Sequence, residues 1–216
     1  MNLFFFALEY DQKMFNETYK TIKDPSEGLY KEKGSKFLSF AYPLNNEEEF
    51  KIIKTNIGQK FHDARHRCYA YRIGYDKAIY RSNDDGEPSN TAGKPILGQI
   101  KSFDLTNILI YVVRYFGGTL LGVGGLINAY KLSANDAIKN AIIIEKTIKD
   151  TYRIDFKYNS MNLIMRILKE NNIQQFNQVF EMNCSLCFSI KKSDKEKILD
   201  KFNKIDDIEL QYLYTN

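Results

Sequence analysis

The sequence predicts an α+β protein of two domains, and three observations indicate this. An apolar run, Ile108–Val113, leads into a glycine-rich segment and then into a helical repeat. After residue 143 the rhythm changes, and strand and helix patterns recur in the order β-α-β-β-α-β. The chain has 216 residues, of which 44% are hydrophobic and 27% charged, which suits one large or two small folded domains.

The first domain is expected over residues 15–143, after an N-terminal extension at 1–14. Its expected elements are, in order, an irregular segment at 15–33 with a turn at Pro25–Gly28, a strand at Lys36–Tyr42, a helix at 47–60, strands at Cys68–Ile73 and Ala78–Ser82, a helix from Thr91 or Ala92 to Phe103, the strand Ile108–Val113, and a helix from Leu126 to about Ile142.

Two of these elements have clear local signals. Asn45 or Asn46 can cap a helix that begins with three glutamates, because acidic side chains stabilise the positive end of the helix dipole. Ile108–Val113 is apolar with almost no alternation, which is typical of a strand covered on both faces. This strand is therefore expected at the centre of the first domain.

The second domain is expected over residues 147–216 and has the order of the split βαβ, or ferredoxin-like, motif. Its expected elements are a strand at Thr147–Tyr158, a helix at Ser160–Asn171, strands at Gln174–Met182 and Ser185–Lys191, a helix capped by Ser193 or Asp194, and a strand at Ile208–Tyr214.

Composition narrows the class of protein. The net charge of +4 and a pI near 8.7 permit nucleic-acid contact without requiring it. No apolar run approaches the roughly twenty residues that cross a bilayer, and Leu3–Leu8 lacks the basic flank of a signal peptide, so a cytoplasmic location without membrane contact is expected. Three cysteines, Cys68, Cys184 and Cys187, argue against a disulfide framework, and the CxxC at 184–187 is interpreted as structural.

Five glycines separate the central strand from the following helix, at positions 117, 118, 122, 124 and 125. If Gly117, Gly118, Gly122, Gly124 and Gly125 form a loop that begins a helix, their N–H groups can bind an anion. Arg114 would then add a bidentate charge at the loop mouth. The alternative is that the glycines only form turns and allow tight packing, since their spacing matches neither a P-loop nor a dinucleotide fingerprint.

Polar residues gather in two further segments, 62–67 and 84–87. The candidate phosphate or nucleic-acid contacts are Arg65, Arg67, Arg72 and Arg114. The alternative acid–base or metal candidates are His62, His66, Asp84, Asp85 and Glu87. A polar surface turn for the first segment and a plain tight turn for the second are the favoured interpretations. No HExxH or GxSxG pattern occurs, so no catalytic residue, metal or cofactor is predicted.

The sequence resembles the YigZ/Impact family over roughly residues 30–140. The matching segments are Lys33–Phe37, His62–Tyr71, Asp84–Pro88, Thr91–Leu97 and Val113–Leu126. The resemblance implies a first domain like the second domain of a small-subunit ribosomal protein and of elongation factors. It implies a second domain like the ferredoxin-like end domains of elongation factors. Eukaryotic relatives act in translational control, and their extra N-terminal partner-binding module has no counterpart in this sequence.

The sequence also departs from the family pattern. Where the family commonly has a lysine and an arginine around the glycine segment, this chain has Leu120 or Leu121 and Asn128. The segment has thus lost positive charge that a phosphate contact would use.

The leading hypothesis is a non-enzymatic cytoplasmic binding protein linked to translation regulation. Its candidate partners are RNA, the ribosome or a translation-regulator protein, and it is expected to be a monomer or a small homo-oligomer. Tyr69, Tyr71, Tyr115 and Phe116 would stack on bases if exposed, or else belong to the core. The alternative is an enzyme or binding protein for a phosphorylated small molecule, with a cleft between the Asp-Asp-Gly-Glu-Pro loop and the glycine segment.

Overall fold

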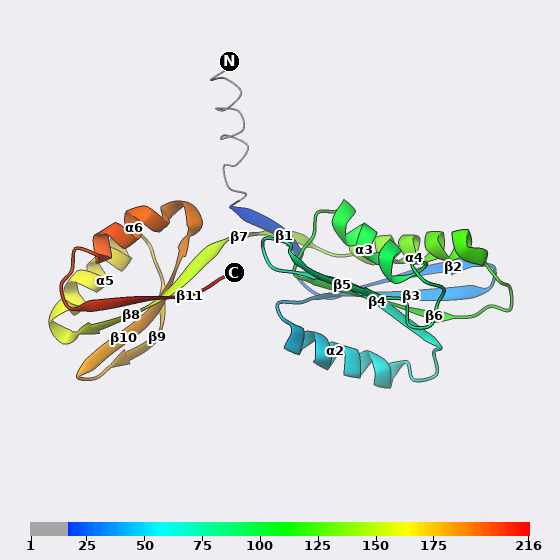
Figure 1. Ribbon diagram of the computed structural model, residues 1–216, viewed down its shortest axis with the longest axis horizontal. Helices are drawn as coiled ribbons and strands as arrows, with labels where there is room; N and C mark the ends of the chain where they lie inside the picture. The colour runs from blue at the N-terminus through cyan, green and yellow to red at the C-terminus, as the bar shows by residue number, and fades with distance from the viewer. Residues whose placement is uncertain (1–16) are drawn as a thin grey trace, which may run out of the picture. The chain divides into compact units, whose positions relative to one another are not determined.

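The computed structural model describes residues 17–216, so the predicted extension 1–14 lies outside the described residues. The chain divides into two compact units (Figure 1): one is Tyr19–Lys146, and the other contains Thr147–Asn216. The predicted α+β fold class is confirmed, since both units combine helices with an antiparallel sheet.

The first unit is built on a five-stranded sheet of order β2-β3-β6-β4-β5, in which all neighbouring strands are antiparallel. Its strands are β2 (Ser26–Glu32), β3 (Ser35–Pro43), β4 (His66–Ile73), β5 (Ile79–Asn83) and β6 (Ile108–Tyr115). Its helices are α2 (Glu47–Lys60), α3 (Gly93–Ser102) and α4 (Gly122–Lys139).

The helices cover both faces of this sheet (Figure 1), with α2 on one face and α3 and α4 on the other. Strand β6 lies at the centre and is buried from Ile108 to Arg114, as the unbroken apolar run predicts. Helix α2 begins where expected, because the side chain of Asn46 accepts a hydrogen bond from the Glu49 N–H at 2.9 Å. The two cores therefore meet along the backbone of β6.

Residues 15–33 were predicted to be irregular, and this prediction is wrong for the described part. Two strands occur there, β1 (Thr18–Ile22) and β2, and β1 pairs with β7 (Ile143–Thr147). Gly28 belongs to β2 and not to a turn. A Cβ at this position would lie 2.5 Å from the Ala137 nitrogen of α4, so the glycine allows close packing of strand and helix.

Helix α4 begins at Gly122, one turn earlier than the apolar repeat predicts. Gly122, Gly124 and Gly125 therefore belong to the first turn of the helix, and only Gly117 and Gly118 lie in the loop before it. Glycine disfavours helix by up to about 1 kcal/mol per residue, and here tertiary contacts of Leu126 and Ala129 override that local preference.

The second unit has the predicted βαββαβ order and a sheet of order β11-β8-β10-β9. Its elements are β8 (Lys149–Lys157), α5 (Met161–Glu170), β9 (Gln175–Phe180), β10 (Asn183–Lys191), α6 (Lys195–Phe202) and β11 (Ile208–Thr215). Ile164 and Leu168 of α5 and Ile198 and Phe202 of α6 pack on the same face of this sheet as Leu186.

Candidate functional site

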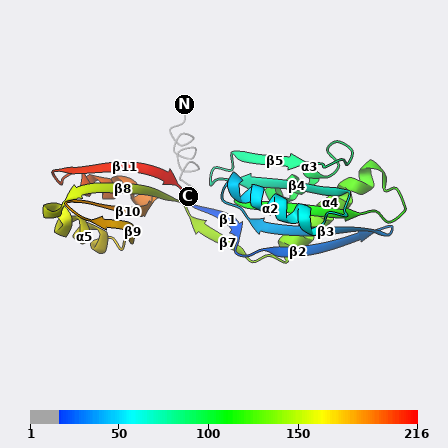
Figure 2. The same ribbon diagram turned by 90° about the horizontal axis from the view of Figure 1, so that it is seen from below.

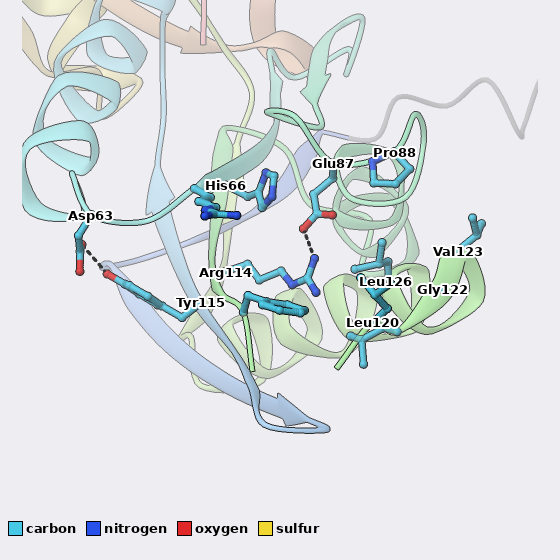
Figure 3. A pocket seen from close by; sticks show the side chains of 13 residues that line it. Asp63, His66, Glu87, Pro88, Arg114, Tyr115, Leu120, Gly122, Val123 and Leu126 are labelled. Carbon is cyan, nitrogen blue, oxygen red and sulfur yellow. Dashed lines mark hydrogen bonds and ion pairs between the residues drawn. The ribbon is translucent and has the colours of Figure 1, made fainter. Parts of the chain in front are cut away.

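A pocket of about 600 Å³ opens where β6 ends and α4 begins (Figure 3). Three segments that are distant in the sequence meet there: the turn before β4, the Asp-Asp-Gly-Glu-Pro loop after β5, and the segment from Arg114 to Leu126. Its lining residues are Asp63, Arg65, His66, Glu87, Pro88, Arg114, Tyr115, Phe116, Leu120, Leu121, Gly122, Val123 and Leu126. The structure thus brings together the polar segments that the sequence singled out.

A buried ion pair lies at the base of this pocket. Arg114 Nη1 donates to Glu87 Oε1 at 2.7 Å, and the exposed fractions of the two side chains are only 7% and 3%. The Tyr130 hydroxyl of α4 donates to the same oxygen at 2.7 Å, and the thiol of Cys68 donates to Tyr130 at 3.4 Å. Burial raises the pKa of both Cys68 and Tyr130, so this network carries neutral groups around one compensated charge pair.

The Arg114 guanidinium lies between two aromatic rings, with 5.5 Å to the Phe37 centroid and 5.7 Å to that of Phe116. Its Nε atom is buried and has no hydrogen-bond partner in residues 17–216. The sequence led us to expect a free charge of Arg114 at the loop mouth. In the structure this charge is buried and paired with Glu87. Because Glu87 compensates it, the base of the pocket has no net charge to attract an anion.

The mouth of the pocket is apolar and exposed. Phe116 is 53% exposed, Leu120 84% and Val123 60%, and we call these three residues the apolar rim. Leu120 or Leu121 stands where the family pattern commonly has a lysine, so a hydrophobic side chain lies where a phosphate contact was considered. The apolar pattern did not single out Leu120 or Val123, although both lie among glycines, and Phe116 was considered only as a residue that stacks on bases.

Four of the five glycines fall into two groups by the space around them. A Cβ on Gly117 would overlap the backbone of Gly34 and Ser35, so Gly117 is required for close approach of two backbone segments. By contrast, the space beside Gly118, Gly122 and Gly124 is open. The start of α4 is therefore accessible from solvent beside the apolar rim.

The aspartate carboxylates of the acidic loop after β5 accept hydrogen bonds from backbone N–H groups. Asp84 Oδ1 accepts from the Ala92 and Gly93 N–H groups at 3.0 and 2.8 Å, which caps the start of α3. Asp84 Oδ2 accepts from Asn90 N–H at 2.9 Å, and Asp85 Oδ2 accepts from Arg67 N–H at 2.7 Å. The tight-turn interpretation therefore accounts for both aspartates.

Replacing Asp84 by alanine is expected to lower the free energy of unfolding by about 2 kcal/mol, because three backbone N–H groups lose their acceptor. Urea denaturation followed by circular dichroism measures this. Asp84→Asn retains one acceptor oxygen and should lose less. Equal losses in the two variants would show that the negative charge, and not the hydrogen bonds, is what stabilises the loop.

The remaining arginine and histidine candidates are scattered. Arg65 is exposed and lines the pocket. Arg67 forms an ion pair with Asp85 at 3.8 Å. Arg72, near the other end of β4, donates to the Leu105 and Lys77 carbonyls, and His62 is exposed just beyond α2. The structure does not assemble the four arginines into one patch.

Other candidate groups are accounted for by the core. Tyr69 and Tyr71 are buried beneath α2, so only Tyr115 and Phe116 of the proposed stacking residues reach the pocket. The His66 ring nitrogen Nδ1 lies 2.8 Å from the Asp85 carbonyl oxygen.

Within residues 17–216, no three His, Cys, Asp or Glu side chains gather to hold a metal ion, and no helix is long and apolar enough to cross a bilayer.

Comparison with known proteins identifies the family of this chain. Residues 33–138 match the Impact N-terminal domain. An IMPACT family member of Haemophilus influenzae is 32% identical, over 79% of this chain and 82% of that protein, and YvyE of Bacillus subtilis is 33% identical over 71% of each. A crystal structure described as that of a hypothetical protein has a TM-score of 0.72 at 26% identity, over 93% of this chain and 99% of that one. With the family's segments assembled around one pocket, the conclusion is that this chain belongs to the IMPACT family.

Proposed function

We propose that this chain is a non-enzymatic binding protein in translation regulation, and that it contacts a protein partner through the apolar rim of the pocket. Family membership supports the link to translation, because eukaryotic members act in translational control. The pocket supports the mode of contact. We further propose that residues 15–143 and 147–216 act as two domains, and that the protein works in the cytoplasm.

The single observation that carries the proposed contact is the exposure of Phe116, Leu120 and Val123 beside a pocket of about 600 Å³. Exposed large apolar side chains that cluster are costly in water and commonly mark interaction sites. An aromatic or aliphatic anchor from a partner would fill the pocket, and the rim would exclude water from it. Ile127, one turn after Val123 and 39% exposed, extends the apolar surface along α4.

The charges favour a protein over RNA at this surface. Phosphate contacts need accessible cations, and affinity then falls steeply with salt. Of the four candidate arginines, Arg114 is buried and paired, Arg67 is partly paired, and Arg72 is engaged by two carbonyls. Arg65 alone among them lines the pocket as an exposed cation.

The geometry gives little support to catalysis. A general acid or base must reach a substrate proton, and Asp84 and Asp85 are occupied by backbone N–H groups. Glu87 is held by Arg114 and Tyr130. These interactions stabilise the loop and leave no carboxylate of that loop positioned for proton transfer.

The second candidate function is binding of a phosphorylated small molecule, and the volume of the pocket favours a ligand of that size. The chemistry of its base does not favour the phosphate. An anion at Arg114 would compete with Glu87 for the guanidinium and bring a second negative charge toward that carboxylate. We therefore rank this function below partner binding.

The test is sedimentation of the tagged protein through a ribosome gradient from cells that produce it, at low and high salt. The rim variant is Leu120→Asp/Val123→Asp, and we expect it to lose co-migration with ribosomal fractions that persists in high salt. The matched control is Ile52→Asp, since Ile52 is also exposed, at 62%, but lies on α2. This control should co-migrate like the natural protein.

Each other result has a defined meaning. Co-migration that disappears in high salt and in Arg65→Ala, but survives in the rim variant, would replace the protein partner by RNA. A protein that remains at the top of the gradient in every condition would contradict the link to translation.

A further inference from the structure

The two edge strands of the five-stranded sheet, β2 and β5, differ in whether other elements cover their outer side. At one edge, side chains from the end of α4 bond to the backbone of β2: Asp136 Oδ2 accepts from Leu29 N–H at 2.9 Å, and Nδ2 of Asn140, the residue after α4, donates to the Glu27 carbonyl at 2.9 Å. Ser26 Oγ also donates to the Ala137 carbonyl at 2.8 Å. Strand β2 is therefore sealed by a helix, which is a common protection of sheet edges.

Strand β5 forms the opposite edge (Figure 2), and in residues 17–216 no strand pairs with its outer side. All five of its residues are exposed, including Ile79 at 52% and Tyr80 at 55%. The backbone of its last residue, Asn83, lies close to Gly93 of α3, since a Cβ on Gly93 would be 2.6 Å from the Asn83 nitrogen. The open part of the edge is therefore Ile79–Ser82.

Positive charge stands on both faces of this open edge. Arg81 pairs across the ladder with Tyr71 and so lies on the face of α2. On the other face, Lys101 Nζ of α3 lies 4.6 Å from the centre of the Tyr80 ring. Neither Arg81 nor Lys101 has a carboxylate partner among the described residues. Two uncompensated cations therefore flank a strand with unpaired backbone groups.

We infer that β5 is a docking edge for an extended acidic segment of a partner protein, which adds a strand to the sheet along Ile79–Ser82. The unpaired backbone groups would supply the hydrogen bonds, as in other strand additions. Successive carboxylates of the segment would alternate between the two faces and reach Arg81 on one side and Lys101 on the other. This surface is separate from the pocket, so the inference does not depend on the proposed function.

The same features discourage the competing occupant, a second copy of this chain. Pairing β5 with another β5 would bring the two sets of cations together, and like charges directly opposite are destabilising. The shortness of the open edge has the same effect, since short and charged edges resist self-association. A carboxylate-bearing segment turns that repulsion into attraction.

The experiment is titration of the isotopically labelled protein with two blocked peptides, Thr-Val-Glu-Glu-Val-Thr and Thr-Val-Lys-Lys-Val-Thr, followed by amide chemical shifts. We expect the glutamate peptide at millimolar concentration to shift the amides of Ile79–Ser82 and to leave that of Leu29 on the sealed edge unchanged. The lysine peptide should shift neither. Arg81→Gln should weaken binding roughly threefold, whereas Lys31→Gln, an equal charge change on β2, should not.

Three results would overturn the inference: no shift with the glutamate peptide, equal shifts with both peptides, or equal shifts at both edges of the sheet. A third probe, decauridylate, distinguishes a nucleic-acid surface. If the oligonucleotide shifts the Tyr80 ring signals while the glutamate peptide shifts no β5 amide, the edge binds nucleic acid and not a peptide strand.

Discussion

Arg114→Ala is expected to lower the free energy of unfolding by about 3–5 kcal/mol, the largest loss we predict for a single side chain. The Glu87 side chain is only 3% exposed in the natural protein, and the substitution leaves it with the Tyr130 hydroxyl as its donor. An uncompensated carboxylate at that depth is costly, because it has lost its hydration without gaining a counter-charge. Urea denaturation monitored by circular dichroism gives the value directly.

Two comparisons separate charge from packing. Arg114→Met/Glu87→Gln removes both charges at similar volume, and we expect it to recover most of the loss because no buried charge remains. Arg65→Ala, a change at an exposed residue that lines the same pocket, should change stability by less than about 0.5 kcal/mol. A double variant as unstable as Arg114→Ala would show that contacts with the rings of Phe37 and Phe116 matter more than the ion pair.

Gly117→Ala has the second-largest expected effect, a loss of about 3 kcal/mol in the free energy of unfolding. The added methyl group would overlap the backbone of Gly34 and Ser35, and a backbone segment cannot rotate away as a side chain can. Strand β3 and the end of β6 would have to separate locally, which also disturbs the Gly117 N–H bond to Ser35 Oγ at 3.1 Å. Thermal unfolding and urea denaturation both report this change.

Gly124→Ala is the matched control for that experiment. Apart from its two chain neighbours and the adjoining helix backbone, no described atom lies within 4 Å of a Cβ at Gly124, and this residue lies in the first turn of α4. Alanine is better than glycine within a helix, so we expect a gain of about 0.5–1 kcal/mol. If both variants lose stability equally, the two glycines would share one role, and the close approach at Gly117 would not be the explanation.

Much of the fold could be predicted from local patterns. The apolar run at Ile108–Val113 predicted a central strand, and the three glutamates after Asn46 predicted the start of α2, since both signals depend on neighbours in the sequence. Strand β2 escaped prediction because its residues alternate in burial only through contact with α4, and Gly28 resembles a turn residue until the Ala137 backbone is seen beside it. The start of α4 was predicted one turn too late, because glycines disfavour a helix locally and only the core contacts of Leu126 and Ala129 override that preference.

The sequence by itself predicted the α+β fold class, the βαββαβ order of elements after residue 147 and the family, because periodicity and ordered motifs carry that information. Only the tertiary structure decided what the candidate residues do. Arg114 and Glu87 are separated by 26 intervening residues, yet β6 and the loop after β5 place them 2.7 Å apart. An ion pair of this kind depends on burial and on distance between remote segments, so a candidate cation in the sequence became a compensated charge beneath an apolar rim.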